Sequence, residues 1–196
     1  MKTRLLTFLG LILVFVPAAF AQQVDETTIV YQKIAKMDAL YNILPLFLTK
    51  AQIDQLLPVL EKARANVRDA KKHEDEFFKN LEPDVDEANR LGFEKQQIPS
   101  DKMRQKFINA MISFAAERET VSSNNTDLAL ATFDKVCNVG QIKAAANTVN
   151  IKFYVPTAKV EDLSLADKER YFVRFVLLDP VVYEVLLELD KTAPAN

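Results

Sequence analysis

The sequence predicts an all-α protein, an irregular bundle of four to six helices with a long, bent second helix. Apolar residues recur at spacings of three and four over most of the 196 residues, as on one face of a helix. The chain has three glycines, and after residue 21 only residues 149–155 are rich in the residue types typical of strands. Because a single short strand has no pairing partner, we expect this run to be an extended strap over the bundle.

Residues 1–21 have the pattern of a cleavable export signal. Lys2 and Arg4 form a basic start, residues 5–16 are apolar, and Ala19-Phe20-Ala21 is a small-x-small cleavage site. A retained membrane anchor is the alternative, but the apolar run is shorter than the roughly 20 residues that a spanning helix needs. We therefore expect cleavage and a soluble chain that is periplasmic or secreted.

The chain after the signal is long enough for one domain with a continuous core. We expect a single helical domain over residues 22–190 and a disordered tail over residues 191–196. Residues 24–44 predict its first helix, which Pro45 ends because the residue before proline is disfavoured in the α conformation.

The second helix is predicted to begin after Thr49. The Thr49 hydroxyl can accept a hydrogen bond from the backbone of Gln52 while the Gln52 amide reaches back, which is a capping box. Pro58 predicts a bend in this helix. The apolar stripe behind the cap, which needs a partner helix, consists of Ile53, Leu56, Leu57, Leu60, Ala63, Val67, Ala70, Phe77, Phe78 and Leu81.

The pattern weakens over residues 82–100, which predicts a connection with at most a short helix. Ser100 and Asp101 then cap a third helix that runs to about Val121. Residues 122–125 are polar and predict a break before a fourth helix over residues 128–136.

The carboxyl-terminal third contains further helix signals. Residues 141–147 are rich in alanine and predict one or two helical turns. Ser164 can cap a helix, and Pro180 at a first helical position restarts it after Asp179. The charges that interrupt the apolar residues 171–189 favour a core or partner-binding helix over a membrane span.

Composition excludes several classes of function. The chain has 27 acidic and 25 basic residues, and Lys2 and Arg4 leave with the signal, so nucleic acid is not an expected partner. After the signal only Gly92 and Gly140 remain, too few for a phosphate-binding loop or a nucleophile elbow. We expect no enzymatic activity and no cofactor.

Three features with chemical potential have ordinary explanations. His73 and Asp69 share a helical face and could hold a metal, but one histidine offers too few ligands, so we expect a solvated face and no metal site. Glu82–Glu87 lacks the ligand spacing of a calcium loop and is expected to be a hydrated linker. Cys137 is expected to be buried as a small apolar residue, with cross-linking of two copies as the alternative.

A basic stretch lies beside the apolar stripe of the second helix. Its members are Lys62, Arg64, Arg68, Lys71 and Lys72. The ordinary interpretation is a solvated face with ion pairs one turn apart. The alternative is a binding surface that buries apolar segments of another protein and attracts acidic ones.

Leu48-Thr49-Lys50-Ala51-Gln52, followed by a long amphipathic helix, resembles the LTxxQ-motif periplasmic family, the Spy-like helical chaperones. The motif residues are Leu48, Thr49 and Gln52, and the nearest second copy, residues 163–167, has serine for threonine and aspartate for glutamine. The resemblance implies a thin, curved, all-helical homodimer whose concave face cradles unfolded client proteins without ATP.

Two functions from different classes follow. The first is an exported helical binding protein that acts as an ATP-independent chaperone or envelope-stress protein on protein clients. The second is a structural or assembly protein of the cell envelope that pairs with one specific protein partner.

Overall fold

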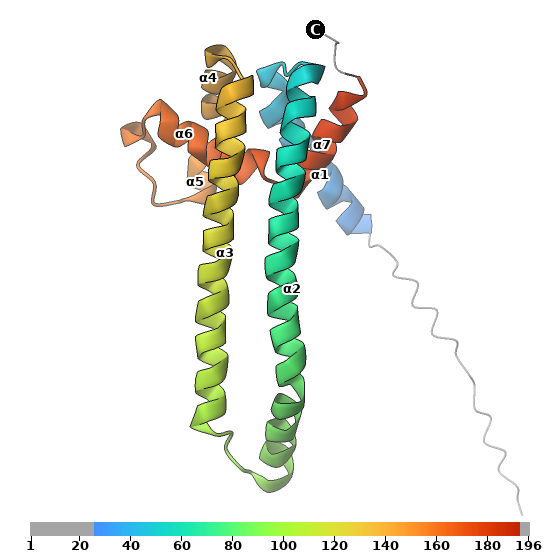
Figure 1. Cartoon of the computed structure of the whole chain (residues 1–196), viewed down its shortest axis with the longest axis vertical. Helices are drawn as coiled ribbons and strands as arrows, with labels where there is room; N and C mark the ends of the chain where they lie inside the picture. The colour runs from blue at the N-terminus through green and yellow to red at the C-terminus, as the bar shows by residue number, and fades with distance from the viewer. Residues whose placement is uncertain (1–25, 193–196) are drawn as a thin grey trace, which may run out of the picture.

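The computed structural model describes residues 26–192, and within them the chain is all-α, as predicted (Figure 1). The predicted signal, residues 1–21, and most of the predicted tail, residues 193–196, lie outside the described residues. The seven α-helices are α1 (Glu26–Ile43), α2 (Lys50–Lys95), α3 (Asp101–Val136), α4 (Val139–Thr148), α5 (Ile151–Tyr154), α6 (Leu165–Phe172) and α7 (Pro180–Asp190). Shorter helical segments are η1 (Leu44–Leu46), η2 (Val160–Asp162) and the π-helical η3 (Val173–Leu177).

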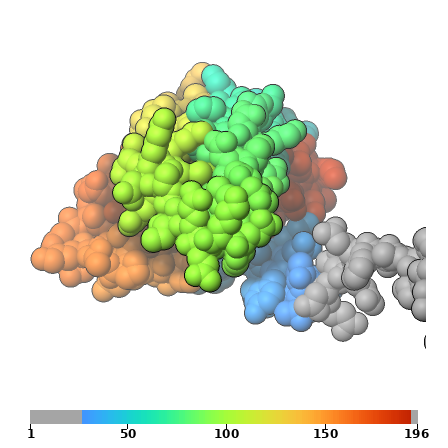
Figure 2. All heavy atoms as spheres, turned by 90° about the horizontal axis from the view of Figure 1, so that it is seen from below, coloured from blue at the N-terminus to red at the C-terminus, as the bar shows by residue number. Residues whose placement is uncertain are grey.

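Two long antiparallel helices, α2 and α3, form a hairpin that dominates the molecule (Figure 1). The remaining helices gather around the end of the hairpin where α2 begins and α3 ends, and we call this assembly the head. The rest of the hairpin, residues 67–121, projects beyond the head, and we call it the stalk. Figure 2 views the molecule from the free end of the stalk.

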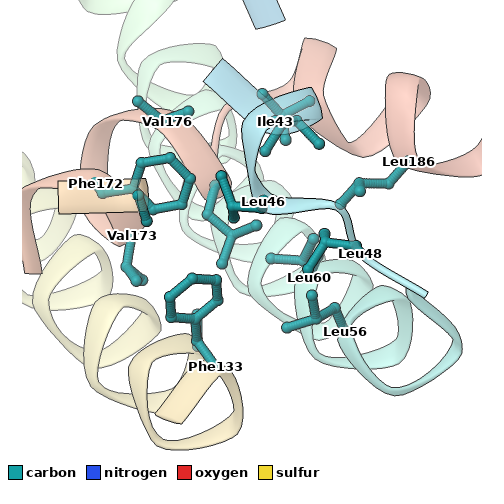
Figure 3. Close-up of a cluster of buried hydrophobic side chains, with 14 of the residues drawn as sticks. Ile43, Leu46, Leu48, Leu56, Leu60, Phe133, Phe172, Val173, Val176 and Leu186 are labelled. Atoms are coloured by element: carbon teal, nitrogen blue, oxygen red, sulfur yellow. The ribbon is translucent and has the colours of Figure 1, made fainter. Parts of the chain in front are cut away.

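The main hydrophobic core lies in the head (Figure 3). It combines the end of α1 with the first turns of α2, the last turns of α3, and α4, η3 and α7. Phe133 of α3 and Phe172 of α6 are fully buried with their ring centroids 5.7 Å apart. On α2 this core ends at Leu60, so the stalk must be stabilised by contacts of its own.

The stalk is held by a cluster of aromatic rings between α2 and α3. Phe114 of α3 is buried, and its ring centroid lies 5.3 Å from that of Phe77 and 5.8 Å from that of Phe78. Leu81 and Ala110 are the other buried apolar residues in this part of the hairpin. The predicted stripe therefore finds its partner in α3.

The start of α2 and its bent course agree with the sequence. The capping box of Thr49 and Gln52 is present, and α2 is a long bent helix with two prolines, Pro58 and Pro83, each of which removes a backbone hydrogen bond (Figure 1). Ser100, Ser164 and the Asp179-Pro180 pair also begin helices as predicted.

The predicted connection over residues 82–100 is wrong for residues 82–95, because α2 continues to Lys95, and only residues 96–100 connect it to α3. Arg90 forms ion pairs with Glu87 and Glu94 at 2.8 and 2.7 Å, one turn away on either side, and these pairs support the helix. The helix ends where Gln96 adopts a left-handed conformation with φ 52°. Residues 82–87 are exposed, so the acidic run is hydrated, but it is helix surface and not a linker.

The predicted break at residues 122–125 is also wrong, since α3 runs through it. Asn125 is buried and donates to the carbonyl of Ala63 at 2.9 Å, while its side-chain oxygen accepts from Asn66 at 2.7 Å. The Thr126 hydroxyl donates to the carbonyl of Ser122 at 2.8 Å. These bonds satisfy the polar side chains that would otherwise favour a loop.

The predicted strap over residues 149–155 is wrong as well, because its centre is the single helical turn α5. Ile151 is buried in the head, and the ring of Tyr154 stacks on that of Phe175 with centroids 4.8 Å apart. These two contacts anchor the turn and override the strand propensity of its residues.

None of the helices between residues 26 and 192 combines the length and apolar character that crossing a membrane requires.

Candidate functional site

A concave surface of the described residues lies where the stalk meets the head. It is a groove of about 630 Å³ between α2, α3 and the chain from Arg174 to Pro180, and we call it the junction groove. Its apolar lining residues are Ala63, Val67, Ala70, Val121, Leu178 and Pro180. Val67 is 54 % exposed although it lies on the predicted apolar stripe, so this part of the stripe is left open by α3.

The third wall of the groove comes from a π-helical turn that the sequence did not reveal. In η3 the Leu178 backbone N–H donates to the carbonyl of Val173, five residues earlier, at 3.1 Å. Val173, Val176 and Leu177 of this segment are buried in the core. Extra residues in a turn shift the side chains that follow, and here Arg174 and Leu178 line the groove.

The rim of the junction groove is mainly basic. Arg64, Arg68 and Lys71, three members of the predicted basic stretch, line it, and Arg118 and Arg174 join them from α3 and η3. The anionic lining residues are Glu74 and Asp75. Of the other predicted members, Lys72 lines a shallower depression beside the groove, and Lys62 lines neither.

The basic residues are already paired with carboxylates, as the ordinary interpretation of the stretch predicts. Lys71 contacts Asp75 at 3.0 Å, and Arg68 and Arg64 contact Glu61 at 2.7 and 3.2 Å. The hydrogen bond from Arg68 lowers the pKa of Glu61. Because exposed ion pairs contribute little stability, an incoming acidic group can exchange for these partners at small cost.

Two longer-range ion pairs connect the groove walls. Arg118 of α3 contacts Glu74 of α2 at 2.6 Å, and Arg174 of η3 contacts Glu119 of α3 at 2.8 Å. The Arg64 guanidinium also lies 4.1 Å from the ring centroid of Tyr183 on α7, which is a cation–π distance. The groove is therefore a preformed surface shared by the hairpin and the head.

The LTxxQ residues lie elsewhere, in a structural joint of the head. Leu48 is buried in the core, and the Gln52 side chain accepts from the backbone N–H of Thr49 at 2.9 Å. The amides of Gln52 and Gln141 bond each other reciprocally at 2.9 and 3.0 Å. Gln141 also donates to the carbonyl of Leu46 at 2.9 Å, so this polar network ties η1, α2 and α4 together.

Sequence reasoning missed Gln141, although a signal for it was present. Asn138 and Gln141 form a second capping box, with the pattern of a capping residue followed three positions later by glutamine. What the pattern could not reveal is that the glutamines of two capping boxes meet. The joint is satisfied internally, which is typical of a structural network rather than of a ligand site.

His73 and Asp69 do not converge on a metal-binding geometry. His73 Nδ1 lies 3.2 Å from Glu117 Oε2, and the imidazole packs edge-on against Phe114 with centroids 5.7 Å apart. Asp69 is exposed and lines a separate shallow depression. Among residues 26–192 no group of three or more His, Cys, Asp or Glu side chains could hold a metal ion.

Cys137 is a buried free thiol, as expected for a small apolar residue. Burial raises the pKa of the thiol to about 12, and the charges of Glu169 and Asp134 add to the effect. A thiol with this pKa and so little exposure is a poor nucleophile.

Glu169 is the other buried ionisable group beside Cys137. Burial, followed by a hydrogen bond with Asp134, raises the pKa of Glu169 to about 7. Its Oε1 atom is buried without a hydrogen-bond partner among the described residues. No sequence signal distinguishes this glutamate from its exposed neighbours.

The chain was compared with protein-family models, curated proteins and solved structures, and no match was found. The resemblance to the LTxxQ-motif family therefore rests on residues 48–52 and on the helical class of the chain.

Proposed function

We propose that this chain is an exported helical binding protein that holds apolar, acidic segments of other proteins in the junction groove without ATP. The observation that carries the proposal is the groove itself, with an apolar floor, a mainly basic rim and walls formed by α2, α3 and η3. An apolar floor gains free energy by covering an exposed apolar segment, and the rim attracts acidic flanks. The export signal and the LTxxQ motif add the expectation of a periplasmic chaperone or envelope-stress protein.

The proposal assigns the chain no chemical step and no cofactor. Exposed ion pairs exchange readily, so the rim can accept acidic groups in several arrangements. This tolerance suits a protein that binds many clients weakly rather than one ligand tightly. Because the rim is solvent-exposed, its contribution should weaken as salt is raised.

Suppression of the aggregation of a denatured test protein measures this function. We expect the purified chain to suppress aggregation at several-fold molar excess. Val67→Glu should abolish most of the effect, because it places a charge on the groove floor while the exposed position tolerates it in the fold. Ile112→Glu is the matched control, since Ile112 is 64 % exposed and does not line the groove.

Two results would contradict the proposal. The first is aggregation of the test protein unchanged by the wild-type chain. The second is equal loss of suppression in Val67→Glu and Ile112→Glu, which would mean that the groove has no special part in binding. Circular dichroism of both variants confirms that each remains helical.

The second candidate function, pairing with one envelope partner, is favoured by the tip of the stalk. Phe93 in the last turn of α2 and Ile98 in the connection to α3 are 89 and 87 % exposed. Large apolar side chains at the end of a long projection are typical of a contact site. This function predicts capture of a stoichiometric partner that is lost in Phe93→Ser and Ile98→Ser, and little affinity of the wild-type chain for unfolded proteins.

A further inference from the structure

Helix α1 has two apolar faces, and only one of them is covered by the head. Ala39 and Ile43 are buried in the core, and Lys36 contacts Glu188 of α7 at 2.9 Å. The other face is between 49 and 73 % exposed at every apolar position. Its residues, which we call the α1 seam, are Val30, Ile34, Met37 and Tyr41 of α1, continued by Leu44 at the start of η1.

The spacing of the α1 seam is that of a coiled coil. Successive seam residues are four, three, four and three positions apart, which is the a and d pattern of a heptad repeat. In this register Ala39 and Ile43 occupy f and c positions, on the side of the helix opposite the seam. A second helix can therefore lie along the seam without displacing α7.

The amino-terminal half of α1 is largely open to solvent. Residues 28–34 are all exposed, and this end of α1 projects from the side of the head (Figure 1). In Figure 2 the visible atoms of α1 lie at the edge of the molecule. A helical segment with no packing partner is marginally stable in water, so a second helix along the seam would stabilise this end of α1.

We propose that the partner is the same helix of a second copy, and that the two α1 helices pair in parallel through the seam. The flanking charges specify this arrangement. Lys33 is at a g position and Asp38 at the next e position, and these positions meet between the strands of a parallel coiled coil. Each chain thus places its Lys33 opposite the Asp38 of the other copy, and symmetry forms the contact twice.

The antiparallel arrangement lacks this complementarity. There, g positions meet g positions and e positions meet e positions, so Lys33 and Asp38 would not come together. Lys33 and Asp38 are both exposed, and neither forms an ion pair with another side chain among residues 26–192. The carboxyl-terminal half of α1 is already ordered by α7, which lowers the entropic cost of pairing.

Sedimentation of the purified protein tests the proposal. A seam of five positions predicts a reversible dimer with a dissociation constant of about 1–100 µM. Ile34→Glu should raise that constant at least about tenfold, since a buried unpaired carboxylate is costly. Ile112→Glu, an equally drastic change at an exposed stalk residue, should leave the dissociation constant unchanged.

Charge exchange and cross-linking test the parallel direction. Lys33→Glu should weaken the dimer, and the double variant Lys33→Glu, Asp38→Lys should restore it. Val30→Cys should form a disulfide-linked dimer, because equivalent positions meet only in a parallel pair, and the native Cys137 is buried.

Three results would overturn the proposal. They are a monomer at concentrations up to about 200 µM, well above the expected dissociation constant, a dimer indifferent to Ile34→Glu, and a dimer that neither recovers on charge exchange nor cross-links through Val30→Cys. The first would assign the seam to a different protein. None of the three bears on the junction groove, so this dimer and the proposed binding function fail or hold separately.

Discussion

At the scale of single residues, the hydrogen-bonded amides of Gln52 and Gln141 join two helix caps that lie far apart in the sequence. Each glutamine serves its own capping box and also bonds the other, so removal of one leaves polar groups of the head without partners. We expect Gln141→Ala to lower the free energy of unfolding by about 1–3 kcal/mol, the cost of unsatisfied buried groups.

A double-mutant cycle tests whether the two amides act together. Gln52→Ala and Gln141→Ala should together cost less than the sum of the single changes, with a coupling energy of about 0.5–3 kcal/mol from denaturant titrations. Gln55→Ala is the control, because Gln55 is exposed and bonds only the carbonyl of Ala51. Strict additivity would show that the network is two independent caps.

Glu169 makes stability depend on pH. Its pKa is raised to about 7 in the folded chain from an ordinary value of 4.5, so between these values the folded state holds a proton that the unfolded state has lost. The free energy of unfolding therefore falls as pH rises from about 4.5 to about 7 and loses nothing further from this group above that range.

Replacing the carboxylate tests this dependence. Glu169→Gln should raise the free energy of unfolding by about 1–3 kcal/mol at pH 8 and change it little at pH 4.5. The measurement is urea unfolding at both pH values, with Glu161→Gln at an exposed position as control. A gain that is equal at both pH values would contradict the assignment of this pH dependence to Glu169.

At the scale of elements, the sequence predicted where helices begin better than where they end. The caps at Thr49, Ser100 and Ser164 are local chemistry, and all three are confirmed. The breaks predicted at residues 82–100 and 122–125 depended on composition, which tertiary contacts overrode.

Of the candidate groove, the sequence predicted three basic residues and the apolar stripe, but not Arg118 or Arg174, because only packing brings α3 and η3 to α2.

The hydrogen bonds of Asn125 stabilise α3 across its polar residues 122–125. Asn125→Ala removes the bonds to Ala63 and Asn66 from a buried position and should lower the free energy of unfolding by about 1–3 kcal/mol. The neighbouring Asn124→Ala, at an exposed position, should change it by less than about 0.5 kcal/mol. Equal effects of the two substitutions in thermal or urea unfolding would contradict this account.

At the scale of the whole molecule, stability is divided unequally between head and stalk. The main core is confined to the head, whereas the stalk depends on a few buried residues and the rings around Phe114. Regions with few buried contacts open at lower free energy than the core. We therefore expect backbone amides of residues 84–95 and 101–109 to exchange with solvent at least about 100-fold faster than those of residues 53–60 and 129–133, measured by mass spectrometry.

Replacing one buried phenylalanine by alanine in the stalk and one in the head distinguishes local unfolding of the stalk from unfolding of the whole chain. Phe114→Ala should accelerate exchange in the stalk while the amides of the head keep their protection, because the head core does not include Phe114. Phe133→Ala should lower the free energy of unfolding of the whole chain by about 3–5 kcal/mol, since its ring is fully buried in that core. If Phe114→Ala lowered the melting temperature as much as Phe133→Ala, head and stalk would unfold as one unit. A stalk that opens separately could expose its apolar rings to a client or partner while the head holds the junction groove in shape.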